Sequence, residues 1–180
     1  MIAFLVPTFL AQLIKNIFGG QSIITANSQW IVGSIVNAAL IISAINLKGW
    51  KKIIGIITMP SISTIVSGYV FGTASIYMVY MIPAIWLGNF LLIYAYKGIL
   101  FSQNKSYFLA GLVGIIAKVF VIFGSFEILQ WFGMFPDKLI KNLQTAMGTT
   151  QLITATMGMV IAFVIYKIET KKLTKENGLR

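Results

Sequence analysis

The 180-residue chain contains no cysteine and no histidine. Thiolate and imidazole groups supply the ligands of haem, of iron–sulfur clusters and of most zinc, nickel and cobalt sites. The sequence therefore predicts a protein without such a metal centre and without a bound cofactor. Catalysis that depends on a histidine base is excluded for the same reason, and we expect the chain not to be an enzyme.

Charged residues are also scarce: they make up 10% of the chain, and the mean hydropathy is +0.88. Soluble domains carry about 25% charged residues. Six apolar runs fill the sequence instead: Ile2–Ile14, Gln29–Leu47, Ile53–Phe71, Ser75–Tyr96, Tyr107–Phe132 and Met147–Tyr166. Each run except the first is long enough, as a helix, to cross a hydrocarbon layer about 30 Å thick. We expect an all-α membrane protein, a six-transmembrane-helix bundle over residues 1–166 with a short basic tail over 167–180.

The basic residues divide unevenly between the two sides that six spans create. One side holds both termini and the second and fourth gaps, and carries ten of them: Lys48, Lys51, Lys52, Lys97, Lys105, Lys167, Lys171, Lys172, Lys175 and Arg180. The other side carries Lys15, Lys138 and Lys141. The positive-inside rule therefore predicts a cell-membrane protein with both termini in the cytoplasm. The tail is expected to meet anionic lipid headgroups, not nucleic acid. We expect no cleavable signal peptide, because no basic residue precedes the first run.

Two of the gaps carry further information. The first outer gap, Gly19–Ser28, is uncharged and rich in hydrogen-bonding groups, among them Asn27; it is either a solvated connection or a lid over a substrate. The third gap, Gly72–Ala74, predicts a tight outer turn. In the fifth gap, Gly133–Ala146, apolar residues recur at three and four positions, which predicts a short amphipathic helix at the outer interface.

Small residues recur at four-residue spacing in several runs. The sets are Gly68 with Gly72, Ser34 with Ala38, Ala110 with Gly114, and Thr154 with Gly158 and Ala162. Such stripes let helix backbones approach closely inside a membrane. They predict either packing within the bundle or docking onto a second membrane subunit.

Two ionisable residues lie within the runs, and both are on the fifth, Tyr107–Phe132. Lys118 is expected near the membrane midplane and Glu127 near the outer surface, with a rise of about 13.5 Å and a half-turn between them, so they cannot pair. An intramembrane lysine indicates either function or structure. Its possible partners are Asn37, Asn89, carbonyl groups freed by a proline, water, or an anionic ligand.

Threonine and glutamine cluster at the outer end of the sixth run. Thr145, Thr149, Thr150, Gln151, Thr154 and Thr156 form this group, which suits an uncharged polar ligand. Aromatic residues in the outer halves of the runs either form an interfacial belt or stack on a ligand. We predict a cavity open to the outside between the fourth to sixth runs. Its expected substrate-binding residues are Tyr80, Glu127, Trp131, Gln151, Thr154 and Asn27.

Three segments of the second to fourth runs form a recognisable pattern: VGSIVNAALIISAINLKGWKK, GIITMPSISTIVSGY and MIPAIWLGNFLLIYAYKGIL. Its characteristic positions are Asn37, Pro60, Gly68, Pro83, Gly88 and Asn89. This pattern resembles the substrate-binding S components of energy-coupling-factor (ECF) transporters. The chain length, the six expected spans and the cytoplasmic termini agree with that family. The first run departs from it, because only Ala3 and Ala11 stand where the family's docking stripe is expected.

The resemblance implies a bundle that captures a vitamin or a vitamin precursor from outside. It also implies partners, namely a membrane scaffold subunit and two ATPases, since no GxxxxGK[ST] motif for ATP occurs in this chain. A rival interpretation is a non-transporting anchor or assembly subunit of another complex, which would use the same small-residue stripes without an outer pocket. An intramembrane enzyme is the most remote alternative, because Lys118 and Glu127 are too far apart to cooperate.

Overall fold

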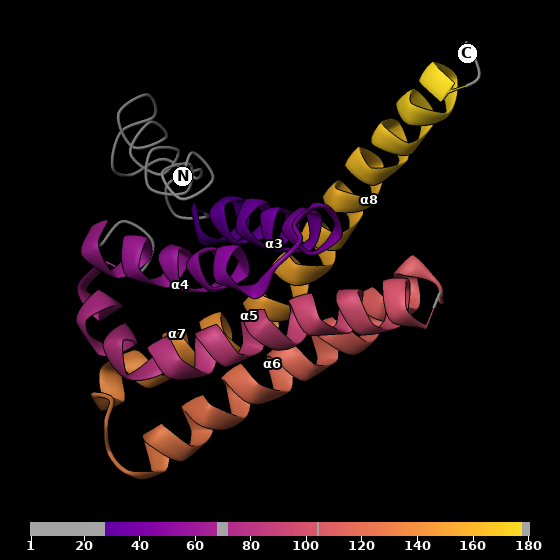
Figure 1. Cartoon of the computed structure of the whole chain (residues 1–180). Helices are drawn as coiled ribbons and strands as arrows, with labels where there is room; N and C mark the ends of the chain where they lie inside the picture. Colours follow the sequence, from indigo (N-terminus) through magenta and orange to yellow (C-terminus); the bar gives the residue numbers. More distant parts are fainter. Residues whose placement is uncertain (1–27, 68–71, 104, 178–180) are drawn as a thin grey trace.

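The computed structural model describes residues 28–67, 72–103 and 105–177, and every regular element in these ranges is a helix (Figure 1). In chain order the elements are α3 (Ser28–Asn46), α4 (Trp50–Ser67), the 3₁₀-helix η1 (Gly72–Met81), α5 (Ile82–Ala95), the π-helix η2 (Tyr96–Ser102), α6 (Tyr107–Trp131), α7 (Asp137–Met147) and α8 (Thr149–Asn177). The expectation of an all-α chain is confirmed for the described residues. The first run, Ile2–Ile14, lies outside them.

Four segments of the described chain are long and apolar enough to cross a membrane: Gln29–Asn46, Ala74–Ser102, Tyr107–Trp131 and Asp137–Lys171. This indicates a multi-pass membrane protein. The third predicted run forms α4, but α4 is not among the four. Its 18 residues include Lys51, Lys52 and Pro60, and part of the apolar end of that run lies outside the described residues.

Two of the predicted runs match helices closely because local signals mark their ends. The fifth run is α6, which begins after Ser106, whose side chain accepts a hydrogen bond from the Leu109 N–H at 3.2 Å. This is a conventional N-cap. Beyond its end, Gly133 has a φ of +71°, a conformation that glycine adopts without strain. The second run is α3, displaced by one residue at each end.

The fourth span differs from a regular α-helix. Its apolar segment, Ala74–Ser102, consists of η1, α5 and η2 in succession, and η1 begins at Gly72, where a tight turn was expected. The span also continues past Tyr96, through Lys97. The Lys97 amine donates to the carbonyl of Leu47 at 2.9 Å, which satisfies an orphan carbonyl at the end of α3.

The predicted amphipathic helix of the fifth gap is confirmed as α7. Its Leu143, Ala146 and Met147 are buried, while Lys138 and Lys141 are exposed. The sixth run is longer than predicted, because α8 continues as a helix beyond Tyr166 through the basic tail to Asn177. The C-terminal end of α8 extends away from α7 and beyond the other labelled helices (Figure 1).

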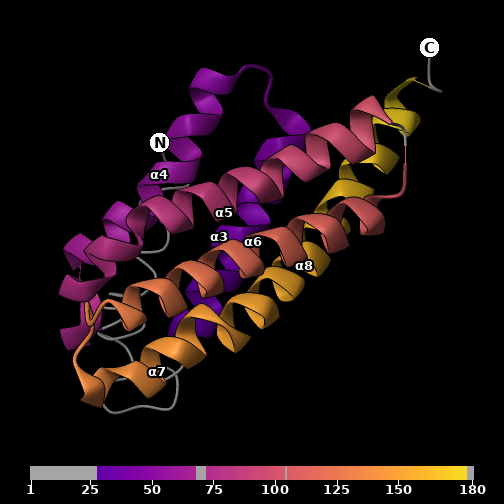
Figure 2. The ribbon, with the colours of Figure 1, turned by 90° about the horizontal axis from the view of Figure 1, so that it is seen from below.

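Close packing of α3 on α8 and of α5 on α6 dominates the bundle, and α5, α6 and α8 lie alongside one another in Figure 2. A Cβ atom added to Gly158 would lie 2.6 Å from the Asn37 Cβ and 2.8 Å from the Ala38 nitrogen. One added to Gly114 would lie 3.0 Å from a methyl group of Leu92. These small-residue stripes therefore pack within the chain. Gly68 lies outside the described residues.

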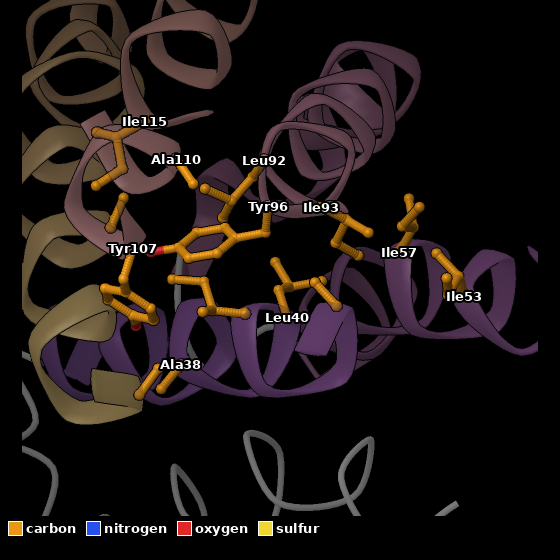
Figure 3. Close-up of a cluster of buried hydrophobic side chains, with 14 residues drawn as sticks. Ala38, Leu40, Ile53, Ile57, Leu92, Ile93, Tyr96, Tyr107, Ala110 and Ile115 are labelled. Atoms are coloured by element: carbon orange, nitrogen blue, oxygen red, sulfur yellow. The ribbon is translucent and has the colours of Figure 1, made fainter. Parts of the chain in front are cut away.

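Two clusters of buried apolar side chains fill the bundle. The first surrounds Tyr96, with Leu40, Ile93 and Ala110 among its members (Figure 3). The second includes Met78, Ile122, Phe126 and Leu143, and so joins α7 to η1 and α6. The fold thus has an apolar core at both ends of α6, with the polar centre of the molecule between them.

Candidate functional site

The buried amine of Lys118 lies at the centre of the bundle, on α6. It donates to the Oδ1 atom of Asn37 on α3 at 2.5 Å and to the Oδ1 atom of Asn89 on α5 at 2.8 Å. All three side chains are at least 97% buried. One amine therefore links three helices through side-chain oxygens, and these are two of the partners that the sequence made available to it.

The amide nitrogens of the two asparagines extend this network. Asn37 Nδ2 donates to the Gly33 carbonyl at 2.8 Å and contacts Thr154 Oγ1 on α8 at 3.5 Å. Asn89 Nδ2 donates to the Ile57 carbonyl on α4 at 3.3 Å. The network therefore contacts five helices, α3, α4, α5, α6 and α8. We refer to Lys118, Asn37, Asn89 and Thr154 as the polar hub.

Glycines make room for the polar hub. A Cβ atom on Gly88 would lie 3.2 Å from the Lys118 Cγ and 3.0 Å from Ile122, and one on Gly33 would lie 3.0 Å from Thr154. No described carboxylate contacts Lys118, so the amine is held by dipoles. Buried polar groups that bond one another across helices stabilise a membrane bundle by about 0.6 kcal/mol per bond. This arrangement ties the helices together, and the amine bonds to side-chain oxygens of two neighbouring helices.

A hollow of about 400 Å³ opens where α6, α7 and α8 meet. We call it the polar hollow, and it is lined by Val119, Phe123, Gln144, Thr145, Gly148 and Thr149. Apolar walls with a few hydrogen-bonding groups, in a volume of about 300–1,000 Å³, are typical of small-molecule sites. The sequence predicted ligand contacts from this threonine and glutamine cluster, and two of its members, Thr145 and Thr149, do border the hollow.

A second hollow, of about 350 Å³, continues along α6 and α8. We call it the α6–α8 groove, and its lining residues are Ile116, Val119, Phe120, Phe123, Gly124 and Leu152. Val119 and Phe123 line both hollows, so the two adjoin each other. The groove therefore leads from the hydrogen-bonding groups near α7 to a wholly apolar surface.

Glu127 does not line the polar hollow but is bonded to Gln144, which does, so its carboxylate lies at the rim. One of its carboxylate oxygens accepts a hydrogen bond from Gln144 Nε2 at 3.0 Å. Glu127 follows Phe123 by four residues and Gly124 by three, which places it on the same face of α6. It lies nine residues from Lys118, and no described contact joins the two.

The other predicted ligand contacts lie outside the lining of the two hollows. Trp131 is 83% exposed and packs on Phe132, and Tyr80 is 48% exposed. Thr154 is buried in the polar hub, and its hydroxyl donates to the carbonyls of Thr150 and Gln151. None of Trp131, Tyr80, Thr154 and Gln151 lines either hollow, and Asn27 lies outside the described residues.

Sequence reasoning missed Gln144 and Gly124 as lining residues. The amphipathic pattern of α7 places Gln144 beside Thr145, on the side that faces away from the buried Leu143. Gly124 stands eight residues after Ile116, on one helical stripe with Phe120 and Phe123. This stripe could have indicated a groove on α6, but an apolar stripe in a membrane span usually faces lipid and so does not identify a binding site. Compared with protein-family models, curated proteins and solved structures, the chain matches none.

Proposed function

We propose that this chain is the membrane-embedded substrate-capture subunit of an ECF-type importer and binds a small vitamin-like molecule from outside the cell. In this proposal the chain has six spans and cytoplasmic termini. It works with a membrane scaffold subunit and two ATPases, which supply the energy that this chain has no motif to provide.

The polar hollow is the observation that carries the proposal. Gln144, Thr145 and Thr149 offer both donors and acceptors beside the apolar walls of Val119 and Phe123. The charge distribution assigns the α7 end of the bundle to the outside, because the fifth gap lies on the side with fewer basic residues. The hollow then faces the compartment from which a substrate would be captured.

The polar hub supports the proposal independently. Three of the positions that carry the family resemblance, Asn37, Gly88 and Asn89, meet at Lys118. If the polar hub fixes the arrangement of the spans, the residues that form it are expected to belong to the sequence pattern of the family. The hub would hold α6 and α8 in the positions that leave the hollow between them.

The test is to purify the full-length chain from its native membrane in mild detergent and to identify bound small molecules by mass spectrometry. We expect one small, vitamin-like compound in near-stoichiometric amount. Thr149→Val removes one hydroxyl from the hollow, worth about 0.5–1.5 kcal/mol, and should weaken binding about two- to tenfold. Thr58→Val, on α4 and away from the hollow, is the matched control.

Recovery of the chain without any bound small molecule, or binding that Thr149→Val leaves unchanged, would contradict the proposed site. Recovery of the chain in a stable complex that contains no ATPase would instead favour the alternative function, an anchor or assembly subunit. Because the small-residue stripes at Gly114 and Gly158 are occupied within the chain, such a subunit would have to dock through another surface.

A further inference from the structure

The α6–α8 groove gives the polar hollow an extension that a compact, polar substrate would not use. The polar hollow and the groove share Val119 and Phe123, and beyond these residues the lining consists of Ile116, Phe120, Gly124 and Leu152. Phe120 is 77% exposed and Ile116 57% exposed. The apolar part of the groove therefore opens laterally, toward the surroundings of the bundle.

Gly124 produces the depression in this surface. A Cβ atom added at Gly124 would have no other atom within 4 Å, so the space above it is empty. The neighbouring lining residues at 116, 120 and 123 carry large side chains that form the walls. A glycine among large apolar residues on one helical stripe leaves a trough between their side chains.

The mouth of the groove suits an uncharged head group. The Thr149 hydroxyl can donate and accept hydrogen bonds, and Gln144 retains its amide oxygen and a second N–H. The Thr145 hydroxyl donates to the Lys141 carbonyl at 3.1 Å and so offers an acceptor. Together these groups match a head group that bears hydroxyls. The carboxylate of Glu127 at the rim would repel an anionic head group, and its bond from Gln144 already satisfies one of its oxygens.

We propose that the polar hollow and the α6–α8 groove together bind a single-chain amphiphile, with its uncharged, hydroxyl-bearing head group in the hollow and its hydrocarbon chain in the groove. The inference rests on the same site as the proposed function and names the chemical class of its ligand, but it does not depend on transport. Such a ligand can enter from the membrane, through the open side of the groove.

The test uses the full-length protein and titrates it with defined probes in native mass spectrometry. The probes share a twelve-carbon chain and differ in the head group: monododecanoyl glycerol, dodecanoate and dodecyltrimethylammonium, with free glycerol as the chainless control. We expect monododecanoyl glycerol to bind at one saturable site, at least tenfold more tightly than the two charged probes. Dodecanoate is repelled by Glu127, and the head group of dodecyltrimethylammonium can neither donate nor accept a hydrogen bond in the hollow. Free glycerol should show no saturable binding.

Variants at Gly124 test the groove directly. Gly124→Leu should weaken the binding of monododecanoyl glycerol at least tenfold because it fills the trough, whereas Gly124→Ala should have a smaller effect. Gly55→Leu is the matched control, since a Cβ atom at Gly55 also has no atom within 4 Å and α4 does not line the groove. Thermal unfolding of each variant shows that it is folded.

Equal, unsaturable binding of the three amphiphiles that Gly124→Leu does not alter would overturn the inference and indicate ordinary boundary lipid. A water-soluble compound that binds the purified chain with no dependence on Gly124 would also overturn it, while leaving the proposed function intact. Saturable, Gly124-dependent binding of monododecanoyl glycerol by a chain that associates with no ATPase would support the inference and refute the importer.

Discussion

Replacing Lys118 by methionine tests whether the polar hub holds the bundle together. Methionine keeps most of the length and volume of the side chain but removes the amine that donates to Asn37 and Asn89. Two interhelical hydrogen bonds are lost, at about 0.6–1.7 kcal/mol each in membrane proteins, and two buried oxygens are left without a donor. We expect Lys118→Met to lower the free energy of unfolding by about 1–3 kcal/mol.

The assay is thermal unfolding of the full-length protein in detergent, followed by circular dichroism of the helical signal. For a chain of this size about 1 kcal/mol corresponds to about 2–4 °C in Tm, so a decrease of about 2–12 °C is expected. The triple variant Lys118→Met, Asn37→Leu, Asn89→Leu removes the orphaned oxygens together with the amine. It should recover most of the loss, because replacing every partner by apolar groups of similar shape is nearly neutral.

Lys105→Met, at an exposed position, is the control for loss of a positive charge and should change stability by less than about 0.5 kcal/mol. If Lys118→Met unfolds at the same temperature as the unaltered protein, or at a higher one, the hub does not stabilise the bundle. If the triple variant is much less stable than Lys118→Met alone, the two asparagines act through contacts other than the amine.

Three further predictions concern packing, capping and topology. Gly158→Ala should lower the Tm, because its Cβ atom would lie 2.6 Å from Asn37. Gly55→Ala should leave the Tm unchanged or raise it, since alanine favours a helix by about 0.5–1 kcal/mol relative to glycine. A higher Tm for Gly158→Ala together with a lower Tm for Gly55→Ala would contradict the packing of α8 on α3. Ser106→Ala should lower the free energy of unfolding by about 0.5–2 kcal/mol, because it removes the N-cap of α6, while Ser106→Thr should lower it only slightly. An equal loss of stability in both variants would show that the cap hydrogen bond is not the cause. Reporter fusions should place Arg180 in the cytoplasm and Lys138 outside; the reverse result would contradict the assigned orientation.

Hydropathy predicted the location of several helices, and the reason is local. The ends of α3 and α6 coincide with the predicted runs to within one residue, because a polar gap or a cap interrupts the apolar sequence there. The end of α8 was not predicted, since hydropathy falls at the edge of a membrane and not where a helix ends. The lysines, glutamates and leucine after Tyr166 are all good helix formers, so the helix continues.

The irregular fourth span was beyond the reach of sequence patterns. The apolar run Ser75–Tyr96 by itself favours an α-helix, because long 3₁₀-helices and π-helices are rare. The departures from it depend on contacts with neighbouring helices. The bond from Lys97 to the Leu47 carbonyl is one such contact, and it joins residues fifty positions apart. No short-range pattern identifies a pair of this kind.

One of the two candidate sites, the polar hub, was predictable from the sequence, and the other, the polar hollow, was not. Asn37 and Asn89 could be named as partners of Lys118, because few other polar side chains are available at that depth in the membrane. The hollow near α7 depends instead on which face of α6 remains uncovered after α3, α5 and α8 have packed. That is a property of the whole bundle, which a sequence pattern does not show. Tyr80 and Trp131 are exposed, and their expected role in ligand binding stays a prediction.

The most direct test of the proposed importer subunit is the composition of the complex that the chain forms in its own membrane. The full-length chain, with an affinity tag after Arg180, is isolated in mild detergent and its stable partners are identified by mass spectrometry. The proposal requires one further multi-span membrane protein together with ATPase subunits that carry the GxxxxGK[ST] motif. Isolation of the chain alone, or with membrane partners and no ATPase, would contradict it.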